Sequence, residues 1–324
     1  MRAFVMAAGL GTRLSPITDH VPKPLVPVAN RPALEHLLAR LPAAGIDEVA
    51  INLHHHGDAV RDAFGDGARL GLRIHWSYEA ELLGTAGGAQ PVSAFLREGR
   101  EPFLVLSGDG LHAVDLEALV HRHRSSRADG TLTVLEIEDP SRFGVCVLDE
   151  DDLIVEFQEK PPLAEARSRL ASCGIYCFEQ HVLDRLSPGA FTDWAKDVLP
   201  AMMADGDRLA AYRTNAYWSD VGTVSDLLRA NLDCVSGALG LGASAGIDET
   251  AVIAPDAEIE GPVAIGAGAR IGAGVRIIGP VAIGAGATIG DGAALRDAVV
   301  LARTAVAPGA IVLGGIVGDI GTLA

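Results

Sequence analysis

The sequence predicts an α/β domain with a mostly parallel sheet, followed by a left-handed parallel β-helix of hexapeptide repeats. Two patterns carry this prediction. Strand-like apolar segments alternate with helix-like segments through the first half of the chain, and large aliphatic residues recur at every sixth position near the end. A chain of 324 residues is longer than a single hydrophobic core usually organises, so we expect two domains, at residues 1–236 and 247–324.

The first domain is expected to consist of βαβ units. Strand-like runs cover residues 2–8, 48–53, 71–77 and 102–106, and helical patterns cover residues 32–43, 88–96 and 115–124. That order is typical of parallel strands joined by crossover helices. Strand-rich segments at 131–157 and 172–178 follow, and then a helix at 194–204, a strand pair at 209–218 and a helix at 224–235.

The second domain begins after a linker of small residues at 236–246. Large aliphatic residues then occupy every sixth position from 247 to 301 and again 313, with Ala307 as the one exception, and Ala, Val or Ile lies four residues after each. In a β-helix, one hexapeptide forms one of three faces of a coil, and its aliphatic residue points inward. We expect about four coils.

Composition and charge limit the kinds of molecule that the protein is expected to bind. A net charge of −16 repels phosphate backbones, so we expect no nucleic acid partner. No apolar run is long enough to span a bilayer and no signal peptide opens the chain, so we expect no membrane partner and a cytoplasmic location. The four cysteines lack metal-type spacing and are expected to be reduced core thiols. Three successive histidines, 54–56, cannot face one ion from a strand.

A glycine-rich turn follows the first strand. Its residues Gly9, Gly11 and Thr12 allow backbone N–H groups to approach a phosphate closely, and Arg13 and Lys23 add two cations. Leu14 stands where the dinucleotide fingerprint has its third glycine, which excludes that motif. The turn therefore predicts a site for a highly charged phosphate chain.

Two aspartates are candidate metal ligands. Asp109 ends a buried strand at the sheet edge where α/β folds bind ligands, and a carboxylate there suits Mg²⁺. Asp220 follows an aromatic pair, 217–218, and taken alone either aspartate could instead cap a helix.

Residues 9–28 closely resemble the opening motif of the nucleoside-diphosphate-sugar pyrophosphorylases, also called sugar-1-phosphate nucleotidyltransferases. The resemblance implies the Rossmann-like nucleotide-diphospho-sugar transferase fold, with nucleoside triphosphate and sugar 1-phosphate as substrates. It also implies that Arg13, Lys23 and Asp109 are catalytic and that Asp109 and Asp220 bind Mg²⁺. The residues that wrap the nucleotide would be Ala8, Gly9, Gly11 and Thr12.

Residues 157–161 resemble the Glu-Lys-Pro motif of the same family. There the glutamate accepts hydrogen bonds from sugar hydroxyls and the lysine pairs with the sugar phosphate, which assigns these roles to Glu159 and Lys160. Gly144 and Gly174 match two glycine-centred strands of the sugar pocket, although Ser172 and Cys173 depart from the family's usual residues. Without its surroundings, the Glu159–Lys160 pair would be an ordinary surface ion pair.

Residues 78–88 resemble the family's base-binding segment, and most of all that of mannose-1-phosphate guanylyltransferases. This implies nucleotide contacts at Glu79, Glu81, Gly84 and Thr85. Guanine presents two neighbouring N–H donors, and an ionised carboxylate only accepts, so GTP and mannose 1-phosphate are the expected substrates. The two glutamates could also be ordinary exposed carboxylates.

Three alternatives remain at this stage. The same chemistry could use UTP, dTTP or ATP with glucose 1-phosphate, or the chain could be a non-catalytic regulatory paralogue that binds nucleotide sugar. A hexapeptide acyltransferase is disfavoured because such enzymes normally use a histidine between coils, and the last histidine, His181, precedes the repeats. We therefore expect the repeats to be structural or to mediate homo-oligomers.

Overall fold

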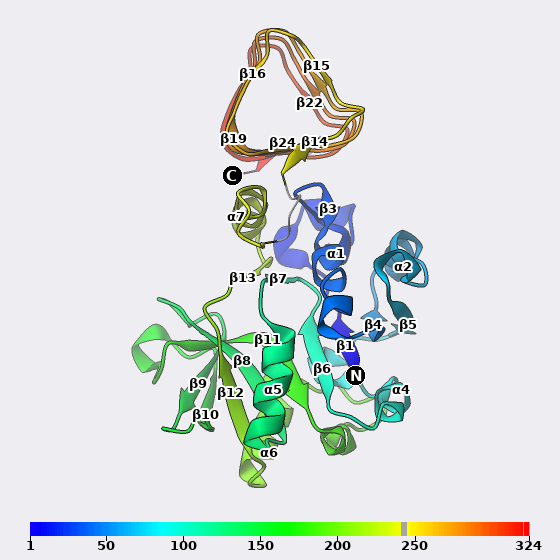
Figure 1. The fold of residues 1–324 in the computed structure, drawn as a ribbon, viewed down its shortest axis with the longest axis vertical. Helices are drawn as coiled ribbons and strands as arrows, with labels where there is room; N and C mark the ends of the chain where they lie inside the picture. The colour runs from blue at the N-terminus through cyan, green and yellow to red at the C-terminus, as the bar shows by residue number, and fades with distance from the viewer. Residues whose placement is uncertain (241–244, 320, 324) are drawn as a thin grey trace. The chain divides into compact units, whose positions relative to one another are not determined.

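The computed structural model describes residues 1–240, 245–319 and 321–323, and the chain folds into two compact units (Figure 1). The first unit contains Met1–Leu10, Leu37–Gly110 and Val114–Trp218. The second contains Gly11–His36, Leu111–Ala113 and Ser219–Ala324. The expected domains, 1–236 and 247–324, are continuous stretches of sequence. The observed units are defined by which residues pack together, and residues 11–36 pack in the same unit as the repeats. Residues 241–244 of the expected linker lie outside the described part of the chain.

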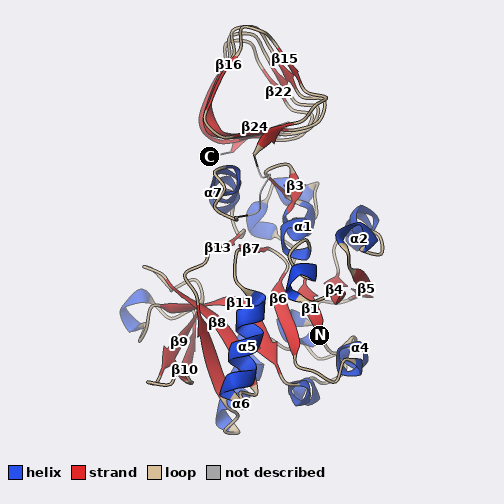
Figure 2. Cartoon of the chain, in the orientation of Figure 1, coloured by secondary structure: helices blue, strands red, loops and turns tan. Residues whose placement is uncertain are grey.

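The first unit is built on a nine-stranded mixed sheet (Figure 2). Its main path runs β10-β9-β11-β6-β1-β4-β5, and β8 joins β11 to β12. The central pairs of β1 with β4 and β6, and of β4 with β5, are parallel, and β11 runs antiparallel to β6, β8 and β9. The strands are β1 (Arg2–Met6), β4 (Glu48–Leu53), β5 (Arg73–Tyr78), β6 (Phe103–Ser107), β8 (Gly130–Glu136), β9 (Gly144–Leu148), β10 (Ile154–Glu159), β11 (Leu170–Phe178) and β12 (Leu209–Arg213). The α/β prediction is confirmed.

Helices accompany this sheet. They are α2 (Gly57–Phe64), α3 (Gly84–Gly87), α4 (Ser93–Glu98), α5 (Leu116–Ser126) and α6 (Leu199–Ala204). The helix expected at 194–204 begins with a π turn at Trp194–Val198, and α2 has no counterpart in the sequence-based prediction. Trp194 is 1% exposed and stacks on Phe178 with ring centroids 4.9 Å apart, which anchors this turn in the core.

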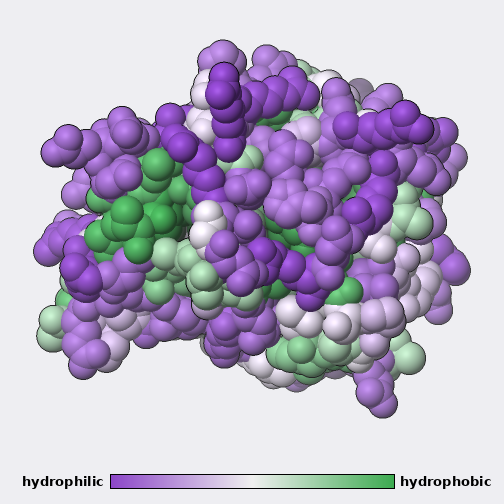
Figure 3. All heavy atoms as spheres, turned by 90° about the horizontal axis from the view of Figure 1, so that it is seen from below, coloured by the Kyte–Doolittle hydropathy of each residue, from purple (hydrophilic) through white to green (hydrophobic). Residues whose placement is uncertain are grey.

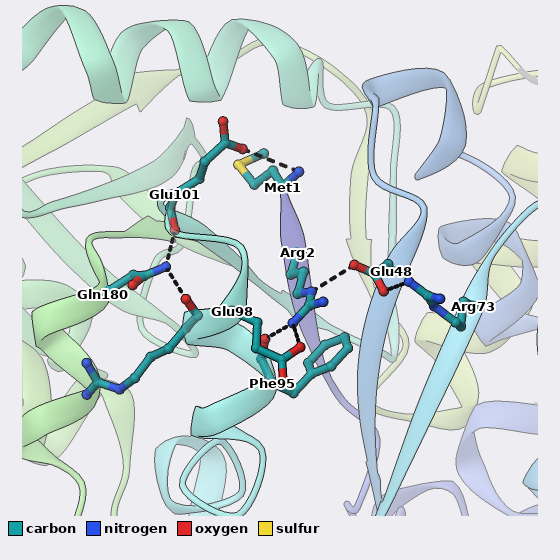
Figure 4. A network of polar contacts seen from close by, with 9 residues as sticks. Met1, Arg2, Glu48, Arg73, Phe95, Glu98, Glu101 and Gln180 are labelled. Atoms are coloured by element: carbon teal, nitrogen blue, oxygen red, sulfur yellow. Dashed lines mark hydrogen bonds and ion pairs between the residues drawn. The ribbon is translucent and has the colours of Figure 1, made fainter.

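Charged side chains join the amino ends of the parallel strands (Figure 4). Arg2 of β1 donates to Glu48 of β4 at 2.9 Å and to Glu98 of α4 at 2.8 Å, and its guanidinium lies 4.2 Å from the ring centroid of Phe95. Glu48 also pairs with Arg73 at the start of β5. These contacts connect strands β1, β4 and β5 at their amino ends. The candidate site residues lie at the opposite edge of the sheet, at the carboxyl ends of the strands.

The repeats of the second unit form a parallel β-helix with three faces (Figure 1). Each strand pairs with the equivalent strand of the next coil, as Val252 does with Arg270 and Arg270 with Thr288. Among the described strands the pairing along the coils is parallel, and β24 is antiparallel to its neighbour β23. The strands are β14 (Gly246–Ile247), β15 (Val252–Ile253), β16 (Glu258–Glu260), β17 (Val263–Ile265), β18 (Arg270–Ile271), β19 (Arg276–Ile283), β20 (Thr288–Ile289), β21 (Ala294–Val300), β22 (Ala305–Val306), β23 (Ile311–Gly318) and β24 (Gly321–Leu323).

The predicted six-residue register holds up to Leu295 and fails beyond it, and at its start Ile247 is in register with Ile265 but is 49% exposed. Ile278 pairs with Arg296, as three hexapeptides per coil require, but Val281 pairs with Ala298 instead of Val299. One coil turns this corner with Gly279 and Pro280, whereas the next uses Asp297 alone, so the six-residue period advances by one position. The buried aliphatic residues are then Val300, Val306 and Val312. Of the residues expected to point inward, Leu313 is 66% exposed and Leu301 is not buried, and of those expected at the corners, Ile311 is 72% exposed and Ala305 is exposed as well.

The same shift explains the apparent exception at Ala307, because the inward residue there is Val306. Close coil spacing accounts for the glycines that follow inward residues. A β-carbon on Gly266 would lie 2.7 Å from the backbone nitrogen of Ala285, and one on Gly284 would lie 2.4 Å from that of Ala302. Such distances leave no room for a side chain.

The second unit has further elements from distant parts of the chain. They are β2 (Pro27–Val28), β3 (Arg31–Pro32), part of α1 (Ala33–Leu38), α7 (Val224–Val235), and parts of β7 (Gly110–His112) and β13 (Trp218–Asp220), which pair with each other. β2 and β3 form a hairpin whose turn is Ala29 and Asn30.

The surface is mostly polar, with apolar side chains gathered in a few patches on the face that Figure 3 shows. None of the helices within the described residues has the length and apolar character needed to cross a membrane. All four cysteines are buried and free, as expected for core thiols. Burial raises the pKa of the Cys146 thiol to about 12, which makes it a poor nucleophile.

A matched pair of isoleucines tests the shifted register. Ile289→Ala removes a side chain that is 1% exposed inside the β-helix and is expected to lower the free energy of unfolding of the β-helix by about 2–5 kcal/mol. Ile311→Ala removes an outward side chain and should change it by less than about 0.5 kcal/mol. Chemical denaturation of both variants measures the difference. Equal losses would mean that Ile311 points inward.

Candidate active site

The first strand delivers its glycine-rich turn to the carboxyl edge of the sheet. The Ala7 N–H donates to Oδ1 of Asn52 at 2.7 Å, and the Gly108 N–H donates to the Met6 carbonyl at 2.9 Å. Ala8 is buried and Gly9 is exposed just after this anchored point. The start of the turn is therefore held by neighbouring strands while its glycine faces solvent.

The rest of the turn belongs to the second unit. Gly11 has a φ of +69°, and its carbonyl accepts from the Leu14 N–H at 2.8 Å and from the Thr18 hydroxyl at 2.9 Å. A β-carbon on Gly11 would lie 3.0 Å from Cβ of Lys23, so the Lys23 side chain runs directly over this glycine. Thr12 and Arg13 are exposed on the short 3₁₀ turn Thr12–Leu14.

Arg13 and Asp220 lie beside the same glycine. A β-carbon on Gly222 would lie 3.0 Å from Oδ2 of Asp220 and 3.3 Å from both terminal nitrogens of Arg13. Thr223 and Asp226 form a capping box at the start of α7, with the Thr223 N–H donating to Asp226 at 3.0 Å. This cap fixes the chain that follows Asp220, so a cation and a carboxylate share one small space within the second unit.

Asp109 lies just beyond the end of β6 and is half-buried. The Ser107 hydroxyl donates to Oδ1 of Asp109 at 2.5 Å. Gly174 of β11, with a φ of +69°, faces Ser107, because a β-carbon there would lie 3.3 Å from Cβ of Ser107. Gly174 thus leaves the space that the Ser107–Asp109 pair occupies.

Trp218 supports the same edge. Its indole N–H donates to the Cys173 carbonyl at 3.0 Å, and its ring meets Phe143 edge-on with centroids 5.0 Å apart. The strand before Gly174 and the loop before Gly144 are joined in this way.

The donor set suits a hard divalent cation. Asp109 and Asp220 offer carboxylate oxygens, and Mg²⁺ is commonly held by one or two carboxylates plus substrate phosphates. Within the described ranges, no group of three or more His, Cys, Asp or Glu side chains could hold a metal ion. The two aspartates fall in different units, so their convergence on one ion stays a prediction.

The predicted sugar-phosphate residues lie along β9 and β10. Gly144 pairs with Glu159, and a β-carbon on Gly144 would lie 2.3 Å from the Phe157 ring. Lys160 has a φ of +49°, is exposed, and its ammonium lies 3.2 Å from Oε1 of Glu159. The structure brings together Gly144, Glu159 and Lys160 as one group in the first unit.

The two glutamates predicted to face the base differ sharply. Glu79 is 6% exposed, and its carboxylate accepts from Nδ2 of Asn52 at 2.7 Å and from the Leu83 N–H at 3.0 Å. Its oxygens therefore anchor the segment internally. Glu81 is exposed and remains the carboxylate that a base could reach.

The rest of the base segment rests on residues 190–194. The Ala86 and Gly87 N–H groups donate to the Thr192 carbonyl at 2.9 and 3.0 Å. The Thr85 hydroxyl donates to Asp193 at 2.9 Å and accepts from the Trp194 N–H at 2.9 Å. A β-carbon on Gly84 would lie 2.5 Å from the Thr192 carbonyl oxygen. Gly84 and Thr85 thus hold the segment in place.

Sequence reasoning missed Ser107 and Asn52. Ser107 had an available signal, because its hydroxyl is only two positions before Asp109 and can hydrogen-bond to that carboxylate locally. Asn52 had none, since its partners Ala7 and Glu79 belong to other strands and loops, far from it in the sequence.

The chain is similar to known nucleotidyl transferases. A family model described as nucleotidyl transferase matches residues 2–237. A mannose-1-phosphate guanylyltransferase of Mycobacterium tuberculosis is 38% identical over 285 residues, covering 85% of this chain and 77% of that protein. A UTP–glucose-1-phosphate uridylyltransferase of Synechocystis is 34% identical over 330 aligned positions, covering 96% of this chain and 85% of that protein.

A solved structure is similar as well. It comes from Bacillus anthracis, is provisionally assigned as a glucose-1-phosphate thymidylyltransferase, and holds a sucrose. It superposes with a TM-score of 0.64 at 26% identity, covering 71% of this chain and 94% of that one.

Glu79 and Glu81 provide a matched test of anchoring. Glu79→Ala leaves the Asn52 amide and the Leu83 N–H without their buried acceptor and should lower the free energy of unfolding by about 1–3 kcal/mol. Glu81→Ala should change it by less than about 0.5 kcal/mol, because this side chain is exposed. Urea denaturation measures both. A neutral Glu79→Ala would remove its anchoring role.

Proposed function

The chain belongs to the nucleotidyl transferase family and is a sugar-1-phosphate nucleotidyltransferase, and from this premise we propose that it joins GTP to mannose 1-phosphate, releasing pyrophosphate. The observation that carries the chemistry is the shared position of Arg13 and Asp220 beside Gly222. Only a glycine leaves that space open, and a cation next to a carboxylate suits a phosphate chain bound with a metal ion.

In the proposed reaction, an oxygen of the sugar phosphate attacks the α-phosphorus of the triphosphate. A new phosphorus–oxygen bond forms as the α–β bridge breaks, and the electron pair leaves with pyrophosphate. Both reactants are anionic, so orientation and charge neutralisation supply most of the rate enhancement. No enzyme nucleophile is required.

Each cation has its own part in this scheme. Arg13 neutralises the departing pyrophosphate, and Lys23, held over Gly11, neutralises the reacting phosphates. Lys160 pairs with the sugar-linked phosphate, and its neighbour Glu159 accepts from sugar hydroxyls. The backbone N–H groups of Gly9, Gly11 and Thr12 approach the nucleotide where side chains would obstruct it.

Mg²⁺ is the proposed cofactor. When bound, it neutralises charge on the phosphate oxygens of the triphosphate. Asp109 and Asp220 would hold it, and the Ser107 hydroxyl orients one oxygen of Asp109 for that purpose.

Guanine is supported by the exposure of Glu81. An ionised carboxylate accepts from both N–H donors on one edge of guanine, whereas uracil and thymine offer a single donor between two carbonyls. Mannose is supported by the 38% identity with the mycobacterial mannose-1-phosphate guanylyltransferase.

A second candidate, UTP with glucose 1-phosphate, is favoured by a different observation. The similarity to the cyanobacterial uridylyltransferase extends over 96% of this chain, including the repeats. The regulatory-paralogue alternative has less support, since Arg13, Lys23, Asp109 and Asp220 are all retained.

We retain the proposals that the protein is cytoplasmic and that it forms homo-oligomers through the β-helix. The outward Ile278, Ile311 and Leu313, which are 38%, 72% and 66% exposed, give the β-helix an apolar outer surface that supports the second of these.

A substrate matrix tests the assignment. Purified protein is incubated with Mg²⁺, one of five nucleoside triphosphates, and mannose, glucose or N-acetylglucosamine 1-phosphate, and pyrophosphate release is measured. GTP with mannose 1-phosphate should give the highest kcat/KM. Glu81→Gln should lower kcat/KM for GTP by a factor that corresponds to a loss of about 1–3 kcal/mol of transition-state stabilisation. A preference for UTP and glucose 1-phosphate would replace the proposed substrates with the second candidate.

Lysine variants test the catalytic scheme. Lys23→Ala should lower kcat about 100-fold or more, because a preorganised charge contact at a reacting phosphate contributes about 3 kcal/mol. Lys196→Ala, at an exposed lysine outside the proposed site, is the matched control and should keep normal turnover. Circular dichroism checks that both variants fold. Near-normal turnover of Lys23→Ala would reject its role.

A further inference from the structure

The catalytic loop is joined to the β-helix through one outer face. Strands β17, β19, β21 and β23 present four outward residues on this face, namely Ala264, Ala282, Val299 and Ile316. The residues beside them in each strand fill the β-helix interior, yet these outward residues are themselves only 4%, 1%, 3% and 0% exposed. Helix α7 packs against β19, β21 and β23 and covers the face. Small alanines let a helix approach closely. The outward Ile311 and Leu313 of another face, by contrast, are exposed.

Helix α7 also holds the hairpin turn through Asn231, which is 1% exposed. Oδ1 of Asn231 accepts from the Ala29 N–H at 2.8 Å, and its Nδ2 donates to the Pro27 carbonyl at 3.1 Å. A second hydrogen bond from Nδ2, to the Leu227 carbonyl at 2.9 Å, uses the other N–H of the amide. The turn is therefore bonded to the helix that lies on the β-helix.

Asn30 attaches the hairpin turn directly to the β-helix. Its Nδ2 donates to the Ala264 carbonyl at 3.1 Å and to the Ile283 carbonyl at 3.0 Å, so it bridges two successive coils. Ala29 and Asn30 have φ values of +46° and +66°, a left-handed conformation that persists where surroundings impose it. A cavity of about 510 Å³ lies beside this turn among the described residues, and Ala29 and Asn30 line it.

The turn is coupled to Lys23 by a short, stiff segment. The chain from Pro22 to Pro27 has three prolines with fixed φ, and the Val26 N–H donates back to the Lys23 carbonyl at 3.2 Å. Lys23 in turn lies over Gly11. The amino end of α7 follows directly after the Asp220 segment, so one helix connects Asp220, the hairpin turn and the β-helix.

We propose that the β-helix is a platform for catalysis, on which Asn30 and Asn231 act as positioning residues that hold Lys23 in register with Asp220. The proposal rests on the proposed roles of Lys23 and Asp220. A displacement of about 1 Å in a catalytic group can cost about 100-fold in rate, so loosening the turn should reduce kcat and leave substrate KM values nearly unchanged.

Asn30→Gly is the most informative variant. Glycine keeps the left-handed turn without strain and deletes only the two hydrogen bonds to the coils. We expect kcat to fall about tenfold, with KM for both substrates changed less than twofold. Asn215→Ala, at an exposed asparagine outside the platform, is the control and should keep normal kcat. Unchanged kcat in Asn30→Gly would overturn the proposal.

A double-mutant cycle separates positioning from general stability. If Asn30 acts through Lys23, the Asn30→Gly change should have little further effect on kcat in a Lys23→Ala background. Full additivity of the two effects would overturn the proposal even if Asn30→Gly alone slowed turnover. The cycle uses whichever substrate pair is most active, so it does not depend on the base or sugar.

Hydrogen exchange provides a readout independent of activity. In Asn30→Gly, backbone amides of residues 23–29 should exchange faster, while those of strands β17 and β19 keep their protection. If wild-type protein released no pyrophosphate with any pair, the proposed function would fail, yet this exchange result would still test the platform. Unchanged exchange at residues 23–29 would overturn it.

Discussion

The docking of helix α7 on one outer face of the β-helix is the interaction on which the second unit depends. It buries Ala264, Ala282, Val299 and Ile316 on the outside of a solenoid, where polar residues would otherwise face water. The same helix starts at the Asp220 segment and carries Asn231 to the hairpin turn. Residues 11–36 from the beginning of the chain and repeats from its end thereby become one compact body.

The first unit uses a different device, which is the pairing of buried polar groups around the sheet edge. Asn52 connects the turn after β1 with Glu79, and Glu79 connects both with the Leu83 N–H. Thr85, Asp193 and the Thr192 carbonyl hold the other side of the base segment. Buried polar atoms are costly when unpaired, so this network defines one arrangement of the loops around the sheet edge. Glu81 and Lys160, by contrast, are exposed.

Family membership and substrate identity rest on different kinds of observation. The order of the glycine turn, Asp109, the Glu159–Lys160 pair and Asp220 is a property of the whole chain, and relatives with guanylyl-, uridylyl- and thymidylyltransferase names share the chemistry. Base choice depends on a few acceptors at one edge of a pocket. Glu79 illustrates the difference, because its residue type suits guanine while its burial commits it to the interior.

The sequence alone determined the α/β order, the repeat architecture and the candidate residues of the site, because periodicity and glycine-rich turns express local backbone rules that need no partner. It wrongly placed Leu301 and Leu313 in the interior, since the shorter corner at Asp297 becomes visible only when coils are aligned side by side. It also could not reveal that residues 11–36 group with the β-helix, or that Asn30, Asn52 and Asn231 hold the site's loops. Those facts depend on contacts between residues far apart in the sequence, and only the folded packing decides which of them form.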